Sequence, residues 1–293
     1  MSGKTLDLDL RRRFYAEEIE AVARLRSRGL VDALAAVPRE QFLPPGPWVT
    51  MGEMDFMGPA RYVTTPDADP KRVYHNIGIA IDATRQLFNG QPATLAVLID
   101  ALGPASGQRV LHVGAGLGYY TAIMAHCVGP TGRVVAYEVD DALASRAREN
   151  LATLPWVEVR TANASEPLGE PFDVMLVNAG VTHPLDTWLD ALAAGGRLVV
   201  PLTAAMPAMG VTLGKGLTWL VTRSDAGDFS ARTLGVVAIY SAIGLRDDQF
   251  NERLGKAMMA GPMKWQSVTR LRRDRHDQSD ACWCHGDGFC LSA

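Results

Sequence analysis

The chain has 293 residues, of which 47% are hydrophobic, so it can bury the core of one large domain or of one domain with an appendage. Its formal net charge of -3 excludes the strongly basic surface on which non-specific nucleic-acid binding depends. No apolar run is long enough to span a bilayer, and the first residues lack the composition of a signal peptide. Three of the four cysteines, Cys282, Cys284 and Cys290, lie close together in the sequence, which is unlike a disulfide framework. We therefore expect a reduced, cytoplasmic protein. We also expect a monomer.

The N-terminal third predicts helices on either side of an irregular segment. Apolar residues recur at helical spacing from Arg13 to Val37, and Gly29 interrupts this pattern, so we expect two short helices. Six prolines between Pro44 and Pro70 disfavour regular structure there, and such a long irregular segment usually covers a site. Residues 92–102 predict a helix that ends at Gly103.

Beyond Gly103 the pattern changes to strands and helices in alternation. The expected elements span residues 109–113, 119–127, 133–137, 142–154, 157–160, 172–177, 185–193 and 197–201. Strands separated by helical stretches form βαβ units and a mainly parallel sheet. The sequence therefore predicts an α/β protein.

The last third predicts an antiparallel edge and a small tail. Three apolar or β-branched runs between Gly210 and Tyr240 are separated by turns at residues 214–216 and 225–227. A helix is expected at 247–259, and a hairpin is expected to turn at 286–288. The tail holds few large apolar residues, so we expect it to pack on the core and not to fold alone.

A glycine-rich turn carries the first sign of a ligand. The strand at 110–113 runs directly into Gly114-Ala115-Gly116-Leu117-Gly118, and a helix follows. Glycines at this place allow a tight turn and bring a ligand close to the free N–H groups of the helix. A dinucleotide-binding turn has its third glycine one place later, where Tyr119 stands. The spacing Gly-x-Gly-x-Gly predicts S-adenosylmethionine instead.

The ends of the following strands predict the rest of a cofactor site. Glu138 ends the second strand, where a carboxylate can accept two hydrogen bonds from a ribose diol. Alternatively, Glu138 is a solvated helix-capping acid and Asn163 an ordinary turn residue. The full set of candidate cofactor-binding residues is His112, Gly114, Ala115, Gly116, Gly118, Tyr119, Glu138, Val139, Asn163, Ala164 and Asn178.

Two further segments carry a family resemblance. Residues 28–32 read Arg-Gly-Leu-Val-Asp, and residues 37–44 read Val-Pro-Arg-Glu-Gln-Phe-Leu-Pro. Together with the glycine turn and Gly195–Pro201, they resemble the protein-L-isoaspartate O-methyltransferases from residue 13 to residue 242. The resemblance implies a doubly wound, mainly parallel, seven-stranded, Rossmann-like methyltransferase fold. It also implies a core at 105–244, after an acceptor-covering region at 1–104 and before an extension at 245–293.

The resemblance implies an acceptor as well, with one departure. The family binds the methyl acceptor with a Gly-Gln-Thr-Ile-Ser segment ahead of Gln-Pro, whereas residues 87–92 read Leu-Phe-Asn-Gly-Gln-Pro here. Asn89, Gly90 and Gln91 are therefore candidate acceptor contacts, and His183 is a fourth because it follows the fourth strand beside the expected pocket. The resemblance implies that the acceptor is a protein or peptide carboxylate, with isoaspartyl as the family type. A carboxylate is already ionised near neutral pH and needs no general base, so no residue is named as the chemical catalyst.

Two alternatives remain open on function. A methyltransferase of the same fold can act on another peptide, on a small molecule or on RNA. Asn178-Ala179-Gly180 stands where amine-methylating enzymes carry an Asn-Pro-Pro-Tyr motif, which counts against nucleobase amines. A non-catalytic homologue that keeps only the cofactor site is the second alternative.

The cysteines of the tail raise the question of a metal. Cys282, Cys284, His285 and Cys290 have the ligand types that zinc prefers. Their spacing is not a standard one, and Trp283 with Phe289 favours a packed apolar hairpin. We therefore expect no metal. His112 lies inside a core strand, where a buried histidine is expected and not a base.

Overall fold

The computed structural model describes residues 3–52, 62–205 and 213–293. The chain forms two compact units. Unit 1 contains Met1–Gly107, Ala115–Val134 and Asp140–Val159, and unit 2 contains Gln108–Gly114, Val135–Val139 and Arg160–Ala293. Within the part that is described, no helix combines the length and the apolar character needed to cross a membrane.

Two helices open unit 1, as predicted, but the break between them is not at Gly29. Helix α1 spans Gly3–Ala23, α2 spans Arg28–Ala36, and Gly29 lies in the first turn of α2. The chain turns at Arg24, which has a φ of 51°. The hydroxyl of Ser27 then caps α2 by accepting a hydrogen bond from the backbone N–H of Leu30 at 3.3 Å. A capping side chain, and not a glycine, therefore sets the boundary.

The proline-rich segment contains more regular structure than the sequence predicts. A four-stranded sheet of order β2-β1-β3-β4 includes strands from this segment, and residues 53–61 of the segment lie outside the described residues. The described prolines precede β1 or follow β2, so none removes a ladder hydrogen bond. The elements are η1 Arg39–Phe42, β1 Val49–Met51, β2 Val63–Thr64, η3 Pro70–Val73, β3 Gly78–Asp82, β4 Leu87–Phe88 and α3 Pro92–Leu102.

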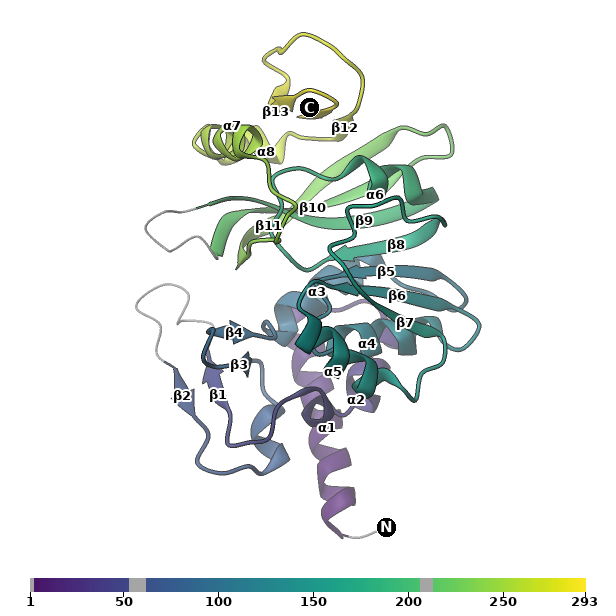
Figure 1. Cartoon of the computed structure of the whole chain (residues 1–293), viewed down its shortest axis with the longest axis vertical. Helices are drawn as coiled ribbons and strands as arrows, with labels where there is room; N and C mark the ends of the chain where they lie inside the picture. Colours follow the sequence, from purple (N-terminus) through teal and green to yellow (C-terminus); the bar gives the residue numbers. More distant parts are fainter. Residues whose placement is uncertain (1–2, 53–61, 206–212) are drawn as a thin grey trace. The chain divides into compact units, whose positions relative to one another are not determined.

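The predicted alternation of strands and helices is confirmed. Its elements are β5 Arg109–Val113, α4 Tyr119–Val128, β6 Arg133–Glu138, α5 Asp141–Leu151, β7 Val157–Thr161, β8 Phe172–Val177, α6 Asp186–Ala191, β9 Leu192–Ala205, β10 Leu213–Arg223 and β11 Phe229–Tyr240. The strands among them lie side by side in one large sheet, in the order β11-β10-β9-β8-β5-β6-β7 (Figure 1). Strand β8 is parallel to β5 and β9, whereas β10 is antiparallel to β9 and β11. The fold class is therefore the predicted one.

The expected turn at residues 214–216 is wrong. Gly214 and Gly216 lie inside β10, which pairs with β9 and β11 on either side, and residues 210–212 lie outside the described residues. A Cβ added to Gly216 would lie 1.9 Å from the carbonyl oxygen of Leu202. The close approach of two strands, and not a turn, therefore requires glycine there. The turn at 225–227 does join β10 to β11.

The tail continues the large sheet. It contains α7 Asp248–Met258, α8 Pro262–Gln266, β12 Arg270–Arg272, β13 Cys282–Gly286 and β14 Phe289–Ser292. Strand β12 pairs with β11 and β14 pairs with β12, so ten strands replace the predicted seven. The hairpin at 286–288 forms as expected.

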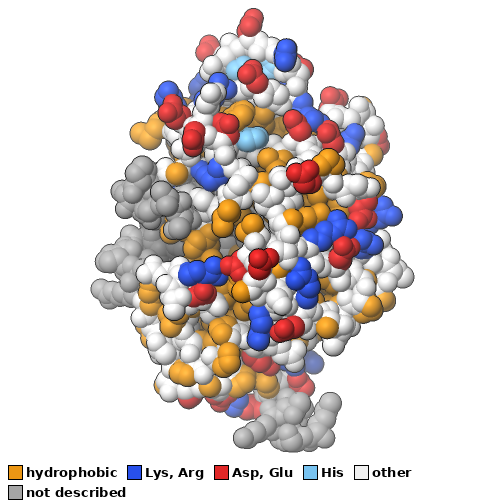
Figure 2. Space-filling view, in the orientation of Figure 1, with side chains coloured by type: hydrophobic (Ala, Val, Ile, Leu, Met, Phe, Trp, Pro, Cys, Tyr) orange, Lys and Arg blue, Asp and Glu red, His pale blue; other side chains and the backbone are white. Residues whose placement is uncertain are grey.

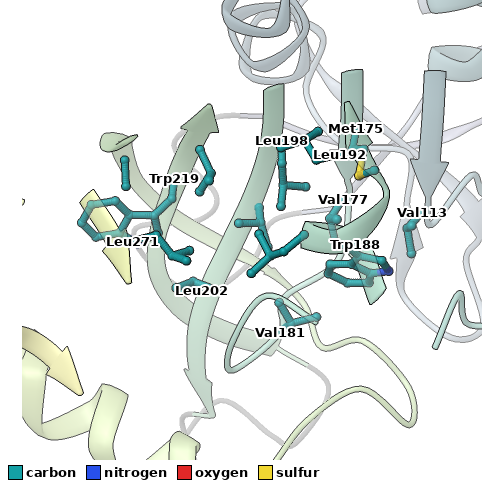
Figure 3. Packing of buried hydrophobic residues seen from close by; sticks show 14 of the residues in the cluster. Val113, Met175, Val177, Val181, Trp188, Leu192, Leu198, Leu202, Trp219 and Leu271 are labelled. Carbon is teal, nitrogen blue, oxygen red and sulfur yellow. The ribbon is translucent and has the colours of Figure 1, made fainter. Parts of the chain in front are cut away.

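The tail also shares the hydrophobic core of unit 2. Leu271 belongs to the same buried cluster as Trp219 of β10 and Leu202 of β9 (Figure 3). The rings of Trp219 and Trp283 lie 5.2 Å apart, and the Trp283 indole N–H donates to the carbonyl of Ala257 at 3.1 Å. Burial of such rings is worth about 1.5–3 kcal/mol each, which gives the tail the surface that it lacks alone.

The charged side chains form no field of one sign on the visible face. Lys and Arg are interspersed there with Asp and Glu (Figure 2). This distribution agrees with the small net charge of the chain.

Candidate functional site

The turn after β5 begins at a glycine that the neighbouring strand requires. The Gly114 N–H donates to the carbonyl of Tyr137 at 2.8 Å, and the Asn178 N–H donates to the carbonyl of Val113 at 2.8 Å. Gly114 has a φ of 84°, and a Cβ added there would lie 3.1 Å from the Asn178 carbonyl oxygen. The backbones at the ends of β5, β6 and β8 thus converge at Gly114.

The rest of the turn leads into the first turn of α4. Gly116 and Gly118 have φ values of 56° and 93°, and the Gly118 N–H donates to the carbonyl of Ala115 at 2.9 Å. A Cβ added to Gly118 would lie 2.8 Å from Cδ1 of Leu151. The positive φ angles favour glycine at both positions, and the free N–H groups that begin α4 follow the turn directly.

Glu138 ends β6 as a buried carboxylate. Its exposed fraction is 8%, and its carbonyl accepts a hydrogen bond from the Ala162 N–H at 3.1 Å. The cap of α5 is Asp140 instead, whose Oδ1 accepts from the Leu143 N–H at 3.0 Å. Glu138 is thus neither solvated nor the helix cap. Val139, beside it, is 40% exposed.

A buried tryptophan holds the turn after β7 through a hydrogen bond. The Trp188 indole N–H donates to the carbonyl of Ala164 at 2.9 Å, and Ala164 has a φ of 58°. Oδ1 of Asn163 accepts from the Ser165 N–H at 3.2 Å, which is a local turn bond. Asn163 therefore fulfils the ordinary turn role, and its amide Nδ2 faces Gly244, 2.9 Å from the place of a Cβ there.

An arginine that the sequence did not point to supports the segment after β8. Arg246 donates from Nη1 to the Gly180 carbonyl at 2.9 Å and from Nη2 to the Thr203 carbonyl at 2.7 Å. The Gly180 N–H donates to the Tyr240 carbonyl at 2.7 Å. These bonds fix the chain that follows Asn178. Arg246 lies 66 residues beyond Gly180, so no local spacing could reveal the contact.

His112 and Tyr119 are core residues. His112 is fully buried within β5, and this burial lowers the pKa of its imidazole to about 3. A histidine that stays neutral to so low a pH is a poor proton acceptor. Tyr119 packs in unit 1 against Phe42 and Tyr15, and burial raises the pKa of its hydroxyl well above the ordinary value.

The expected acceptor segment combines structural hydrogen bonds with two buried amide nitrogens, Nδ2 of Asn89 and Nε2 of Gln91, that have no hydrogen-bond partner among the described residues. Oδ1 of Asn89 accepts from the Ile79 N–H at 3.0 Å and from Nη2 of Arg39 at 3.4 Å. Gly90 has a φ of 77°, and a Cβ there would meet Leu95 at 2.8 Å. Gln91 is 7% exposed, and its Nε2 has no hydrogen-bond partner among the described residues. Buried donors nearly always have a hydrogen-bond partner, so this amide nitrogen is a candidate for binding a ligand.

The β3–β4 hairpin lies against the glycine turn within unit 1. Cδ1 of Ile81 is 3.5 Å from the place of a Cβ on Gly116. Nη1 of Arg85 donates to Oδ2 of Asp140 at 2.5 Å. Hydrogen bonds from Thr84 and Arg85 lower the pKa of Asp82 to about 2, so this carboxylate remains ionised. No local pattern in the sequence could reveal the contacts of Ile81 with Gly116 and of Arg85 with Asp140, because these partners lie far apart in the chain.

His183 lies in unit 2, among residues of the tail. Its Nδ1 is 3.1 Å from the hydroxyl of Thr182, and its ring stacks on Phe250 of α7 at a centroid distance of 4.6 Å. Burial lowers the pKa of His183. The other three acceptor candidates belong to unit 1.

A sequence model of one family matches two thirds of the chain. The model of the protein-L-isoaspartate(D-aspartate) O-methyltransferase family, PCMT, matches residues 17–210. A protein-L-isoaspartate O-methyltransferase from Methanopyrus kandleri is 28% identical over 78% of this chain and 89% of its own length. Protein-L-isoaspartate O-methyltransferase 1 from Rhodopseudomonas palustris is 32% identical over 80% of this chain and 83% of its own length.

A solved structure shows the same fold. It belongs to a Plasmodium falciparum protein assigned as a protein-L-isoaspartate O-methyltransferase and contains S-adenosyl-L-homocysteine. Its TM-score is 0.57 at 18% identity, over 79% of this chain and 97% of that one. The fold and the glycine turn define a Rossmann-like methyltransferase that uses S-adenosylmethionine. Within that class, the chain belongs to the protein-L-isoaspartate(D-aspartate) O-methyltransferase family.

We predict that the buried imidazole of His112 makes the fold sensitive to acid. The folded pKa lies below the unfolded one, so its stabilising effect is complete above pH 6.5 and is lost as the pH falls toward 3. From pH 7 to pH 5, the unfolding free energy of the wild type should fall by about 2 kcal/mol more than that of His112→Leu. Chemical unfolding at both pH values measures this difference. The control His126→Leu changes an exposed histidine and should keep most of the decrease. Equal pH slopes for wild type and His112→Leu would contradict the assignment.

Proposed function

We propose that this protein transfers a methyl group from S-adenosylmethionine to a carboxylate of a protein or peptide, with an isoaspartyl side chain as the acceptor type. The observation that carries the proposal is the buried carboxylate of Glu138 at the end of β6, one strand from the glycine turn. A carboxylate at the end of this strand can accept both hydrogen bonds from the hydroxyl groups of a ribose diol. The substrate named for the relatives supports the acceptor type.

The residues at the strand ends fit the cofactor. The positive φ angles of Gly114, Gly116 and Gly118 fit a glycine-rich turn that brings the backbone close to a ligand at the start of α4. Glu138 would hold the ribose, the Asn163-Ala164 turn the adenine edge, and Asn178 the methionine end. When bound, S-adenosylmethionine supplies an electrophilic methyl group on a sulfonium.

The protein's own contribution is to bind, orient and exclude water. A carboxylate acceptor is ionised near neutral pH and needs no proton acceptor. The neutral, buried His112 is consistent with this requirement. Within unit 1, the β3–β4 hairpin lies beside Gly116 through Ile81, so we assign it to covering this part of the glycine turn.

Residues 87–92 depart from the family's acceptor segment, which supports a difference in how the acceptor peptide is bound. Oδ1 of Asn89 accepts from the Ile79 N–H, whereas the amide nitrogens of Asn89 and Gln91 have no hydrogen-bond partner among the described residues. We propose that Gln91 binds the acceptor peptide, because a buried amide donor suits a carboxylate or a peptide carbonyl. The free thiols of Cys127, Cys282, Cys284 and Cys290 suit the reducing, cytoplasmic setting that the sequence predicts.

Methyl transfer to matched peptides tests the proposed function. Radiolabelled S-adenosylmethionine is incubated with the protein and with two peptides that differ only in an isoaspartyl or a normal aspartyl linkage. We expect label on the isoaspartyl peptide, released by mild base as an ester is. Label on cell-extract proteins but on neither peptide would refute the isoaspartyl acceptor, and base-stable label would refute carboxylate methylation.

We predict that Glu138→Gln weakens the binding of S-adenosylhomocysteine by about 1.5–3 kcal/mol, because the neutral amide cannot replace a charge-assisted hydrogen bond. Calorimetry measures the change. The matched control is Glu158→Gln on β7, an exposed glutamate that pairs with Arg133 at 2.7 Å. Unchanged affinity in Glu138→Gln, or an equal loss in the control, would contradict the assignment of Glu138 to the cofactor.

We predict that Gln91→Met raises the KM for the peptide and leaves the unfolding free energy unchanged, because its Nε2 has no partner to lose among the described residues. Asn89→Ala should instead lower the unfolding free energy by about 1–3 kcal/mol, because it leaves the Ile79 N–H unpaired. Peptide titrations and chemical unfolding of both variants separate the two roles. An unchanged KM in Gln91→Met would make this segment structural alone.

A further inference from the structure

Four metal-binding side chains converge in the tail, and the proposed function uses none of them. His276, Cys282, His285 and Cys290, which we call the tail quartet, each offer a ligand atom, and these atoms lie within 4.8 Å of one another. Sγ of Cys282 lies 3.8 Å from Nε2 of His276. Two cysteines and two histidines in one cluster form the donor set of many structural zinc sites.

Backbone register brings the four residues to one place. His285 and Cys290 are directly opposite each other in the β13–β14 hairpin. An irregularity between Cys282 and Cys284 breaks the simple alternation of side chains along β13. As a result, Cys284 joins the hydrophobic core cluster of unit 2, while Cys282 joins the tail quartet. On a regular strand, these two cysteines would face the same side.

The histidines have their ring nitrogens arranged for a ligand. Nδ1 of His276 lies 2.9 Å from the backbone carbonyl of Asp274, so this nitrogen carries the proton and Nε2 presents its lone pair toward Cys282. Metal-bound histidines in proteins are commonly oriented by such a carbonyl. Nδ1 of His285 is buried without a hydrogen-bond partner among the described residues. An unpaired, buried ring nitrogen is unusual unless it binds something.

We propose that the tail quartet binds one zinc ion as a closed structural site. In a tetrahedral site the ligand atoms lie about 3.3–3.8 Å apart, given Zn–N and Zn–S bonds of about 2.0 and 2.3 Å. The separation of 3.8 Å between Cys282 and His276 is already near this range. The widest separation, at most 4.8 Å, needs to shrink by about 1 Å. Four protein ligands leave no open position for substrate or water, so the metal is not catalytic.

The position of the site defines its task. His276 lies in the connection between β12 and β13, while the other three ligands lie on the β13–β14 hairpin. A zinc ion would tie that connection to the hairpin at the outermost strands of the large sheet. Packing of Trp283 and Leu271 already fixes the inner side of the tail, and the metal fixes the outer side. The apolar hairpin that the sequence favoured and the zinc site thus use opposite sides of the same strands.

Zinc content of the full-length protein tests the proposal. The chain is produced in zinc-supplemented medium, purified without chelator and measured by elemental mass spectrometry. We expect one zinc per chain in the wild type and in Cys284→Ser, and a nearly complete loss in Cys282→Ser and Cys290→Ser. Cys284 is a matched control because it is a buried thiol on the same strand but lies outside the tail quartet.

A second measurement on the wild type covers the case in which a serine variant fails to fold. Apo-protein prepared with a chelator is titrated with Co²⁺, whose spectrum reports tetrahedral geometry and thiolate ligands. We expect tetrahedral bands with thiolate charge transfer, abolished by one equivalent of zinc. Substoichiometric zinc without these bands would overturn the proposal. So would equal zinc loss in Cys284→Ser, or a Cys282–Cys290 disulfide whose reduction does not restore metal binding. None of these readouts depends on methyl transfer.

Discussion

Two backbone hydrogen bonds at the end of β5 are the constraint on which the proposed site depends. The Gly114 N–H bonds to β6 at the Tyr137 carbonyl, and the Asn178 N–H bonds to β5 at the Val113 carbonyl. They draw three strand ends so close that the space beside the Asn178 carbonyl admits no side chain at Gly114. Glu138 follows Tyr137 and ends β6, the strand next to β5 in the sheet. The need for glycine at position 114 and the buried position of the Glu138 carboxylate thus both follow from the way these strand ends meet.

The chemistry that we propose asks little of individual side chains. Carboxylate methylation proceeds without proton abstraction, so the site needs positioning and dryness more than a base. The titratable groups agree: His112 is held neutral by burial, and Tyr119 is held protonated by burial. The groups that we assign to ligands are of another kind. Glu138 is a buried acid at the end of a strand, and Gln91 is a buried amide whose Nε2 has no hydrogen-bond partner among the described residues.

Local patterns in the sequence predict what local physics decides. The strand before Gly114, the helix at residues 92–102 and the hairpin at 286–288 follow from hydrophobic periodicity and turn residues within a few positions. Contacts between distant segments leave no such pattern. Arg85 with Asp140, Arg246 with Gly180, and Ile81 beside Gly116 became visible through the fold alone. Gly216 was misplaced for the same reason, since a facing strand and not its neighbours in sequence requires a glycine there.

The tail shows how one irregularity changes the chemistry that a sequence can offer. Strict alternation along β13 would direct Cys282 and Cys284 to one side and leave His285 with a single cysteine opposite. The irregularity after Cys282 moves that thiol to the side of His285 and Cys290, where His276 completes the set. Cys284 meanwhile fills the core beside Trp283 as a small apolar side chain. A strand that binds a metal on one side and packs a core on the other needs both cysteine environments, and a break in register is the simplest way to obtain them.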